Sequence, residues 1–209
     1  MQSRVLRTIR WISFALIILL AGFYAGSYFW TIERKPAPAA ARLDASPAVD
    51  RLPEFVLADL NGDVRSIADW KDRPLLINFW ATWCAPCRRE MPMLETLHQE
   101  RRNDPLTIIG IAIDRVDDVA AFVPESGVTY PVLVGQSDAM DLAYLIDPDF
   151  TAMPFTVFTA PGGRILTVFT GELHPGQLRA ILRISDDVAA GRTAVDEARR
   201  QLADLALRD

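Results

Sequence analysis

The chain is poor in the residue types that most often bind metals or form structural cross-links. Its only cysteines are Cys84 and Cys87, and its only histidines are His98 and His174. A cross-link across two intervening residues closes a very small loop, so a structural disulfide here constrains little of the unfolded chain. If one helix runs from Cys87 through His98, the two lie about 16 Å apart, which is too far to share a zinc ion.

Lysine is also scarce, and arginine supplies nearly all of the positive charge. The net charge is −5, and no basic stripe is interleaved with aromatic residues. The sequence therefore gives no reason to expect nucleic-acid binding. The 50% hydrophobic and 23% charged residues are ordinary for a globular protein. Once the N-terminal segments are set aside, about 155 residues remain, enough for one domain with its own core.

The two cysteines lie where an apolar run changes into a helical pattern. Residues 75–80 (Leu-Leu-Ile-Asn-Phe-Trp) are typical of a strand buried on both faces. Thr82 is the predicted N-cap of the helix that follows, and Pro86 falls in its first turn. Cys84 is therefore expected at a helix N-terminus, where free N–H groups and the helix dipole lower a thiol pKa. We interpret this pair as a redox site.

The residues of this stretch also carry a family resemblance. Asn78-Phe79-Trp80-Ala81-Thr82-Trp83-Cys84-Ala85-Pro86-Cys87, followed by Arg88, Glu90, Met91 and Pro92, closely resembles the TlpA-like thiol–disulfide reductases of the thioredoxin fold, which include the membrane-anchored ResA and CcmG (DsbE) types. Ordinary thioredoxins usually carry aspartate at the position of Asn78. The resemblance implies a redox-active disulfide with no other cofactor and no metal, and it makes Trp83, Pro86 and Asn78 supporting residues.

The N-terminus has the pattern of a membrane anchor. Basic residues at positions 4, 7 and 10 precede an uncharged run over residues 11–30, and twenty helical residues match the hydrocarbon core of a bilayer. We predict a cytoplasmic segment at 1–10, an anchor at 11–31 and an exported remainder. The alternative is a cleaved signal peptide, with small residues at 39–41. Residues 32–51, rich in proline and alanine, are predicted to be an extended linker.

The remainder alternates between strand and helix patterns. Strands are predicted at 55–60, 63–66, 75–80, 106–113, 132–134, 155–159 and 165–169, and helices at 66–70, 85–102, 116–126, 138–146 and from 175 onward. Asn61-Gly62 favours a type I′ turn in the first hairpin. We predict an α/β, thioredoxin-like domain over 52–190, with a mixed central sheet flanked by helices and an N-terminal hairpin. An amphipathic helix is expected within 191–209, either packed on the domain or binding a partner.

Pro154 is the predicted partner of the cysteine pair. In thioredoxin folds a cis-proline faces the cysteines, and the backbone beside it pairs with the substrate. By resemblance that residue is Pro154, preceded by Met153, although a trans proline at a sheet edge is the alternative. Ala152 and Phe155 depart from the family's usual Gly-x-Pro-Thr pattern, so the substrate class stays open.

Asp114, at the end of the strand that follows the active-site helix, has two interpretations. In ResA-like members an acidic residue at the corresponding place lies near the cysteines, and a carboxylate there would raise a thiol pKa and take its proton. The alternative is a solvated loop aspartate or a helix cap. Arg88 and Arg89 likewise either add positive potential near the pair or only solvate the helix.

The predicted reaction is thiol–disulfide exchange, in which Cys84 attacks a substrate disulfide and Cys87 resolves the mixed disulfide. The resemblance implies an exported disulfide-containing protein as substrate, cytochrome c maturation among its settings, and a membrane electron donor of the DsbD/CcdA type. The alternatives are an oxidase or isomerase, and a non-enzymatic membrane-tethered chaperone or metal-delivery module. Peroxidase activity is disfavoured because the Pro-x-x-x-Thr-x-x-Cys surroundings of peroxiredoxins are absent.

Overall fold

The structure is a computed structural model that describes residues 18–20, 22–24, 41–45 and 47–206. It divides into two units, Met1–Ala39 and Ala40–Asp209. In the first unit only residues 18–20 and 22–24 are described, and they are helical. The predicted cytoplasmic segment, most of the predicted anchor and the linker up to residue 40 lie outside the described residues. Among the residues that are described, no helix has the length and apolarity needed to span a bilayer.

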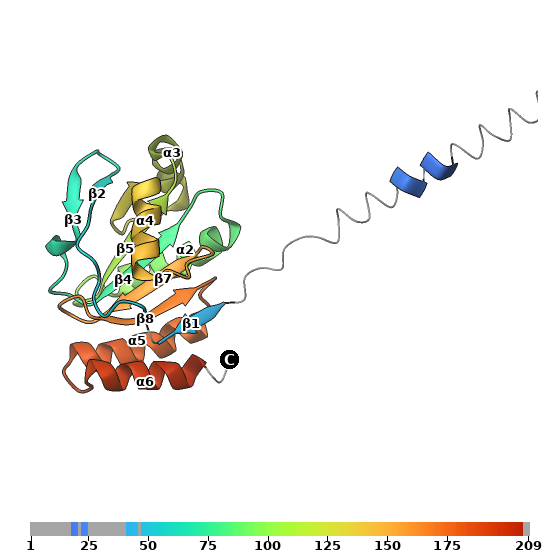
Figure 1. The fold of residues 1–209 in the computed structure, drawn as a ribbon. Helices are drawn as coiled ribbons and strands as arrows, with labels where there is room; N and C mark the ends of the chain where they lie inside the picture. The colour runs from blue at the N-terminus through green and yellow to red at the C-terminus, as the bar shows by residue number, and fades with distance from the viewer. Residues whose placement is uncertain (1–17, 21, 25–40, 46, 207–209) are drawn as a thin grey trace, which may run out of the picture. The chain divides into compact units, whose positions relative to one another are not determined.

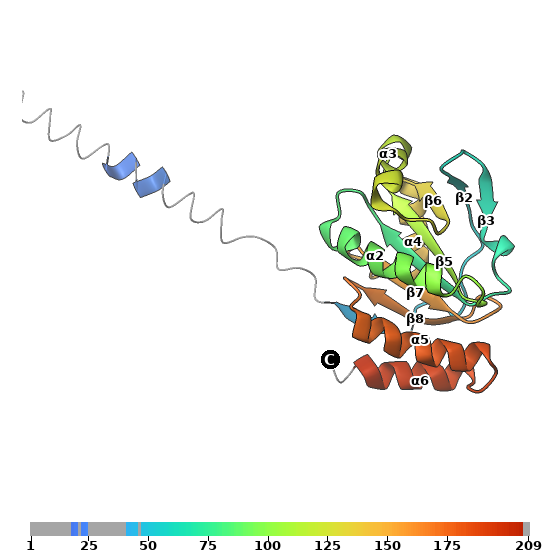
Figure 2. The same ribbon diagram turned by 180° about the vertical axis from the view of Figure 1, so that it is seen from behind.

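The second unit is a single eight-stranded sheet with helices on both faces (Figures 1 and 2). In chain order its elements are β1 (Arg42–Asp44), β2 (Val56–Asp59), β3 (Val64–Ser66), the 3-10 helix η1 (Ile67–Asp69), β4 (Leu75–Trp80), α2 (Ala85–Glu100), β5 (Thr107–Ile113), α3 (Val116–Ser126), β6 (Val132–Gly135), α4 (Ser137–Ile146), β7 (Phe155–Thr159), β8 (Ile165–Thr170), α5 (Pro175–Ala189) and α6 (Val195–Ala206).

The strand order is β1-β8-β7-β4-β5-β6-β2-β3. The neighbours β4–β5 and β5–β6 are parallel, because α2 and α3 provide the crossover connections, and the other pairs are antiparallel. The predicted mixed sheet of a thioredoxin-like α/β domain is thus the observed architecture. The predicted bounds of α3 agree with the structure at both ends.

Strand β4 occupies the middle of the sheet and is buried along its whole length. Successive side chains point to opposite faces, so Leu76 and Trp80 join one hydrophobic cluster while Ile77 and Phe79 join the other. Helices α2, α3, α5 and α6 contribute to the cluster on the first face, and α4 covers the second, which faces the viewer in Figure 1. Coverage on both faces explains why the strand is a continuous apolar run with one exception, Asn78.

The first hairpin forms as predicted, but its turn differs from the type I′ expectation. That turn requires positive φ at both central residues, and among the described residues only glycines have positive φ. Instead Gly62 alone takes φ +84°, its N–H bonds the Asp59 carbonyl, and the Asp59 side chain accepts from the N–H groups of Asn61 and Asp63. Because the Asp59 carboxylate accepts hydrogen bonds from two N–H groups of the loop, it stabilises this turn in place of a type I′ turn.

The predicted linker is wrong at its C-terminal end. Arg42–Asp44 is strand β1, paired antiparallel with β8, and Ala45 is buried. The domain therefore begins about ten residues earlier than the predicted residue 52. A three-residue strand with two charged side chains has no apolar alternation from which it could be predicted. It forms because it pairs with β8.

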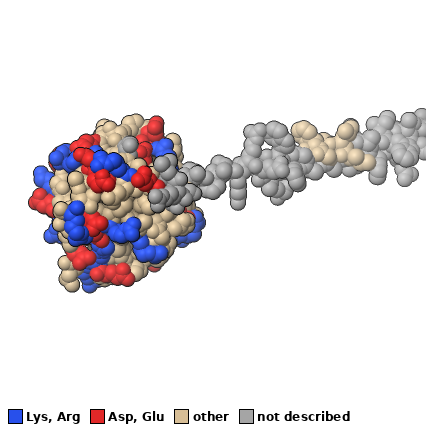
Figure 3. Space-filling view, turned by 90° about the horizontal axis from the view of Figure 1, so that it is seen from below, with Lys and Arg blue, Asp and Glu red and all other residues tan. Residues whose placement is uncertain are grey.

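The C-terminal amphipathic stretch forms helix α6, which packs on the domain. Ala198 and Leu202 are fully buried, and α6 contacts β1, β8 and α5. Arg199 donates to the Ile165 carbonyl and pairs with Asp50, so the same helix also holds the segment that follows β1. Seen from below in Figure 3, basic and acidic side chains are interspersed on this face, and neither sign of charge forms a large continuous patch there.

Because α6 completes the core, shortening its buried side chain is expected to destabilise the whole domain. We predict that Leu202→Ala lowers the free energy of unfolding by about 3 kcal/mol through lost burial and a residual cavity. Urea denaturation measures this. The matched control is Asp204→Ala, an exposed position on the same helix. Equal stability of the two variants would contradict the packing described for α6.

Candidate active site

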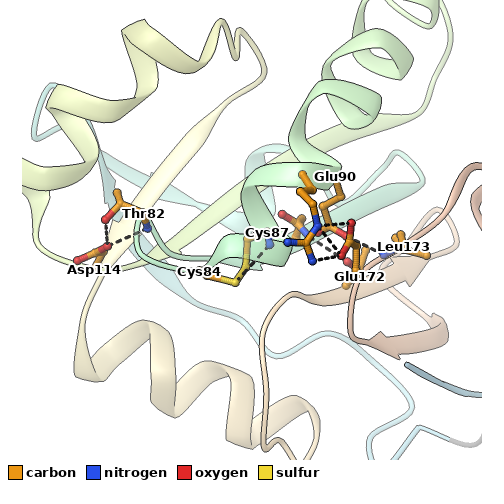
Figure 4. The surroundings of a disulfide bond; sticks show 10 residues. Thr82, Cys84, Cys87, Glu90, Asp114, Glu172 and Leu173 are labelled. Atoms are coloured by element: carbon orange, nitrogen blue, oxygen red, sulfur yellow. Dashed lines mark hydrogen bonds and ion pairs between the residues drawn. A yellow bond between two sulfur atoms is a disulfide. The ribbon is translucent and has the colours of Figure 1, made fainter. Parts of the chain in front are cut away.

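Cys84 and Cys87 form a disulfide at the start of α2 (Figure 4). The loop that leaves β4 at Ala81 brings Cys84 to the helix, and Pro86 lies in the first turn, as predicted. Cys84 is 5% exposed and Cys87 is fully buried. The outer sulfur is therefore the one that a substrate disulfide reaches first.

The N-cap of α2 is Cys84, and the prediction of Thr82 as N-cap is wrong. The Cys84 Sγ itself accepts from the N–H of Cys87, at 3.3 Å, and the Cys84 carbonyl accepts from Arg88. The sulfur thus occupies the position of a capping oxygen, among the free N–H groups of the first turn. After reduction these groups and the helix dipole favour a thiolate on Cys84 over a neutral thiol.

Thr82 instead bonds Asp114. The Thr82 N–H and hydroxyl both donate to Asp114 Oδ2, at 2.9 and 2.6 Å, and the Arg115 N–H donates to Oδ1. Burial raises the pKa of Asp114, but these hydrogen bonds outweigh it, so the pKa lies below its usual value. Asp114 is therefore ionised at neutral pH. It holds the loop that carries Cys84, and no hydrogen bond joins it to either sulfur within the described structure.

The functional residue that sequence reasoning missed is Glu90. It lies one helical turn after Cys87 and is 2% exposed. Its Oε1 accepts from Asn78 Nδ2 at 2.7 Å, and its Oε2 accepts from the Leu173 N–H at 2.8 Å. The Asn78 amide also donates to the Thr156 hydroxyl at 3.0 Å. The predicted supporting residue Asn78 thus acts by positioning a buried carboxyl group.

Burial raises the pKa of Glu90 to about 7, against the lowering effect of the bonds from Leu173 and Asn78. Near neutral pH this group is therefore able both to accept and to donate a proton. The signal that could have identified it is its position, since Cys87, Glu90, Met91 and Leu94 share the buried stripe of α2. A glutamate on such a stripe needs a partner, which Asn78 provides.

The Met153–Pro154 peptide bond is cis, as predicted. Phe155 of β7 pairs with Phe79 of β4, so Pro154 lies level with the end of β4, from which the cysteine loop leaves. Its carbonyl accepts from the Gly171 N–H at 2.7 Å. Met153 is half-buried and packs against both hydrophobic clusters. The structure therefore places the Pro154 loop and the cysteine loop at the same end of the sheet.

Three further side chains surround the pair. Trp83 is 69% exposed directly beside Cys84 and offers an apolar surface to a polypeptide. Arg88 stacks over the Phe122 ring, with 5.4 Å from Cζ to the ring centroid. Arg89 donates to Glu172, so its charge is paired.

In the part of the chain that the structure describes, no cluster of three or more histidine, cysteine or acidic residues is arranged to hold a metal ion.

Comparisons with known proteins agree with this geometry. Residues 48–168 match the model of the AhpC/TSA family. The chain is 28% identical over 173 residues to the thiol-disulfide oxidoreductase ResA of Geobacillus thermodenitrificans, covering 82% of this chain and 90% of that protein. It is 29% identical over 170 residues to the thioredoxin-like protein YneN of Bacillus subtilis, covering 78% and 91%.

Solved structures show the same fold. The crystal structure of a secreted thiol-disulfide isomerase from Corynebacterium glutamicum matches with a TM-score of 0.57 at 24% identity, covering 80% of this chain and 95% of that one. At this identity the similarity establishes the thioredoxin-like fold alone.

The raised pKa of Glu90 makes stability depend on pH. The group titrates near 4.5 when unfolded and near 7 when folded, so between these values the folded state holds a proton that the unfolded state has lost. Stability therefore falls as pH rises through this window, by about 3 kcal/mol in total. We predict that Glu90→Gln removes most of this fall, measured by urea denaturation at pH 5 and pH 8. Glu54→Gln, at an exposed position, is the control and retains the fall.

Proposed function

The chain belongs to the AhpC/TSA family, and from this premise we propose that it is an extracytoplasmic thiol–disulfide oxidoreductase that reduces disulfides in exported proteins. The observation that carries the proposal is the Cys84–Cys87 disulfide at the N-terminus of α2, with the outer sulfur slightly exposed and the inner one buried. The relative ResA is named a thiol-disulfide oxidoreductase, and this name supports the same reaction class.

The reaction follows from the different surroundings of the two sulfurs. In the reduced protein the Cys84 thiolate attacks one sulfur of a substrate disulfide, which forms a mixed disulfide and releases the other substrate sulfur as a thiolate that takes up a proton. Cys87 then loses its proton and attacks Cys84 Sγ. This step releases the second substrate thiolate and forms the Cys84–Cys87 disulfide. Two electrons have passed to the substrate, and the protein is left oxidised.

Glu90 is the ionisable group suited to take the proton from Cys87. It lies one turn away on the same buried face of α2, and its pKa of about 7 lets it accept a proton near neutral pH. Asp114 is less suited to this transfer, because its lowered pKa makes it a weaker base than Glu90 near neutral pH.

Peroxide reduction is not part of the proposal. In the peroxiredoxin pattern a proline and a threonine stand seven and three residues before the reactive cysteine. Ile77 and Ala81 occupy these positions relative to Cys84.

The location and the partners are proposed from the sequence. The apolar run over residues 11–30 and the basic residues before it support a single anchor in the cytoplasmic membrane with the domain outside. A reductase in an oxidising compartment needs electrons from within the cell, so a membrane donor of the DsbD/CcdA type is the proposed partner. Cytochrome c maturation is the proposed setting. No cofactor beyond the disulfide enters the reaction.

The direction of electron flow is tested by the reduction potential of the Cys84–Cys87 pair, measured by equilibration with glutathione or dithiothreitol. We predict a value below about −220 mV, in the range of reducing thioredoxin-like proteins. A value near about −120 mV, that of a strong oxidant such as DsbA, would identify an oxidase and reject the reductase direction.

The roles of the two cysteines are tested by trapping. We predict that Cys87→Ala accumulates a mixed disulfide on Cys84 with its protein substrate, because the resolving thiol is missing. Non-reducing gels followed by mass spectrometry identify the captured protein. Cys84→Ala is the matched control and captures none, because Cys87 is buried. Capture of small thiols alone would refute a protein substrate.

A further inference from the structure

Strand β1 lies beside the loop that the proposed substrate would contact. Arg42 pairs with Thr170, the last residue of β8, and Gly171 follows directly. Gly171 has φ +104°, and a Cβ placed on it would lie 2.9 Å from the Ala41 Cα. Its N–H donates to the Pro154 carbonyl. The start of the domain is therefore packed against the residue that holds the cis-proline.

The side chain of Arg42 reaches the other end of the same loop. Its Nη2 lies 3.7 Å from Asp147 Oδ2, and at the same distance from Asp44 Oδ2. Asp147 is the C-cap of α4, its N–H bonds the Ala143 carbonyl, and its Oδ1 accepts from the Asp149 N–H. From Asp147 the chain runs through residues 148–153 to Pro154.

The environment of Asp147 makes the contact with Arg42 important. The Asp147 side chain is 9% exposed, whereas that of Arg42 is 54% exposed. A nearly buried carboxylate is unfavourable unless a cation or hydrogen-bond donors compensate it. Among the described residues, Arg42 is the cation within ion-pair distance of Asp147. Loss of Arg42 would leave the Asp147 carboxylate drawn towards water, and the loop would move with it.

We propose that Arg42 of β1 is a positioning residue for the cis-proline loop and so determines how well the protein disulfide substrate binds. The inference rests on the proposed function and deepens it. Arg42 touches no reacting atom, and it acts through Asp147 and the loop 147–154. A polypeptide substrate that pairs with the backbone beside Pro154 depends on the position of this loop. A small disulfide that reacts only with Cys84 does not depend on it.

The test compares Arg42→Gln with Arg192→Gln in the full chain. Arg192 is a matched control, because it is 62% exposed and its ion pair with Asp187 lies at the turn between α5 and α6. For Arg42→Gln we expect a rise of about five- to tenfold in KM for insulin reduction, with kcat, the reduction potential and the rate with a small aromatic disulfide unchanged. Arg192→Gln leaves all four quantities unchanged.

A second variant separates the ion pair from general damage. Asp147→Asn removes the carboxylate that Arg42 compensates and keeps a side-chain oxygen for the Asp149 N–H, so KM for insulin is expected to stay near the wild-type value. Added to Arg42→Gln, it is expected to reverse most of the rise in KM, and a double variant as impaired as Arg42→Gln overturns the proposal. Unchanged KM in Arg42→Gln overturns the proposal. Equal losses with insulin and the small disulfide also overturn it, since they indicate damage to the fold.

Hydrogen exchange of residues 147–154 provides a readout that does not depend on activity. Arg42→Gln is expected to speed amide exchange in this loop at least severalfold, with α2 unaffected. Unchanged exchange overturns the positioning role, whether or not the wild-type chain reduces insulin. If Arg42→Gln speeds exchange in this loop but the wild-type protein reduces no protein disulfide, the positioning role is supported and the proposed function is rejected.

Discussion

The site depends on the hydrogen bonds of one buried carboxyl group, that of Glu90. It bonds Asn78 of β4 and Leu173 of the segment after β8, so one side chain of α2 joins the centre of the sheet to a distant part of the chain. Asn78 in turn reaches Thr156 of β7. An aspartate at position 78 would place two carboxyl groups in contact, and one would have to stay protonated at a high cost. The asparagine therefore allows α2 to carry a buried glutamate without a second carboxyl group in contact with it.

The residues from Gly171 to Leu173 join the parts of the site. Gly171 bonds the carbonyl of the cis-proline, Glu172 pairs with Arg89, and Leu173 bonds Glu90. Three successive residues thus hold the substrate-facing loop and the redox helix at a fixed separation. A displacement of this segment would change both the proline and the proton acceptor. The redox helix and the proposed substrate-binding loop are therefore linked by one backbone hydrogen bond, one ion pair and one hydrogen bond to a side-chain carboxyl group.

The sequence predicted the parts of the fold that local pattern determines. The apolar run of β4, the bounds of α3 and the stripe of α6 follow from periodicity, and they agree with the structure. Strand β1 was missed because pairing with β8 creates it. The N-cap of α2 was misplaced because a cysteine sulfur replaces the usual hydroxyl, while Asp114 bonds Thr82. The position of Glu90 on the buried stripe of α2 could have indicated its burial, but its partners Asn78 and Leu173 are far away in the sequence and only the fold brings them together.

The family resemblance and the site do not cover the same residues, and the difference has a physical meaning. The segment 48–168 contains both cysteines, Asn78, Glu90 and Pro154, which are the groups of the proposed exchange site. The Glu90 partner Leu173 lies after it, and strand β1 lies before it. Helix α6, which also lies outside this segment, packs on β1 and β8. A change in the outer segments would therefore alter the acidity of Glu90 or the position of the Pro154 loop while leaving the cysteine pair intact.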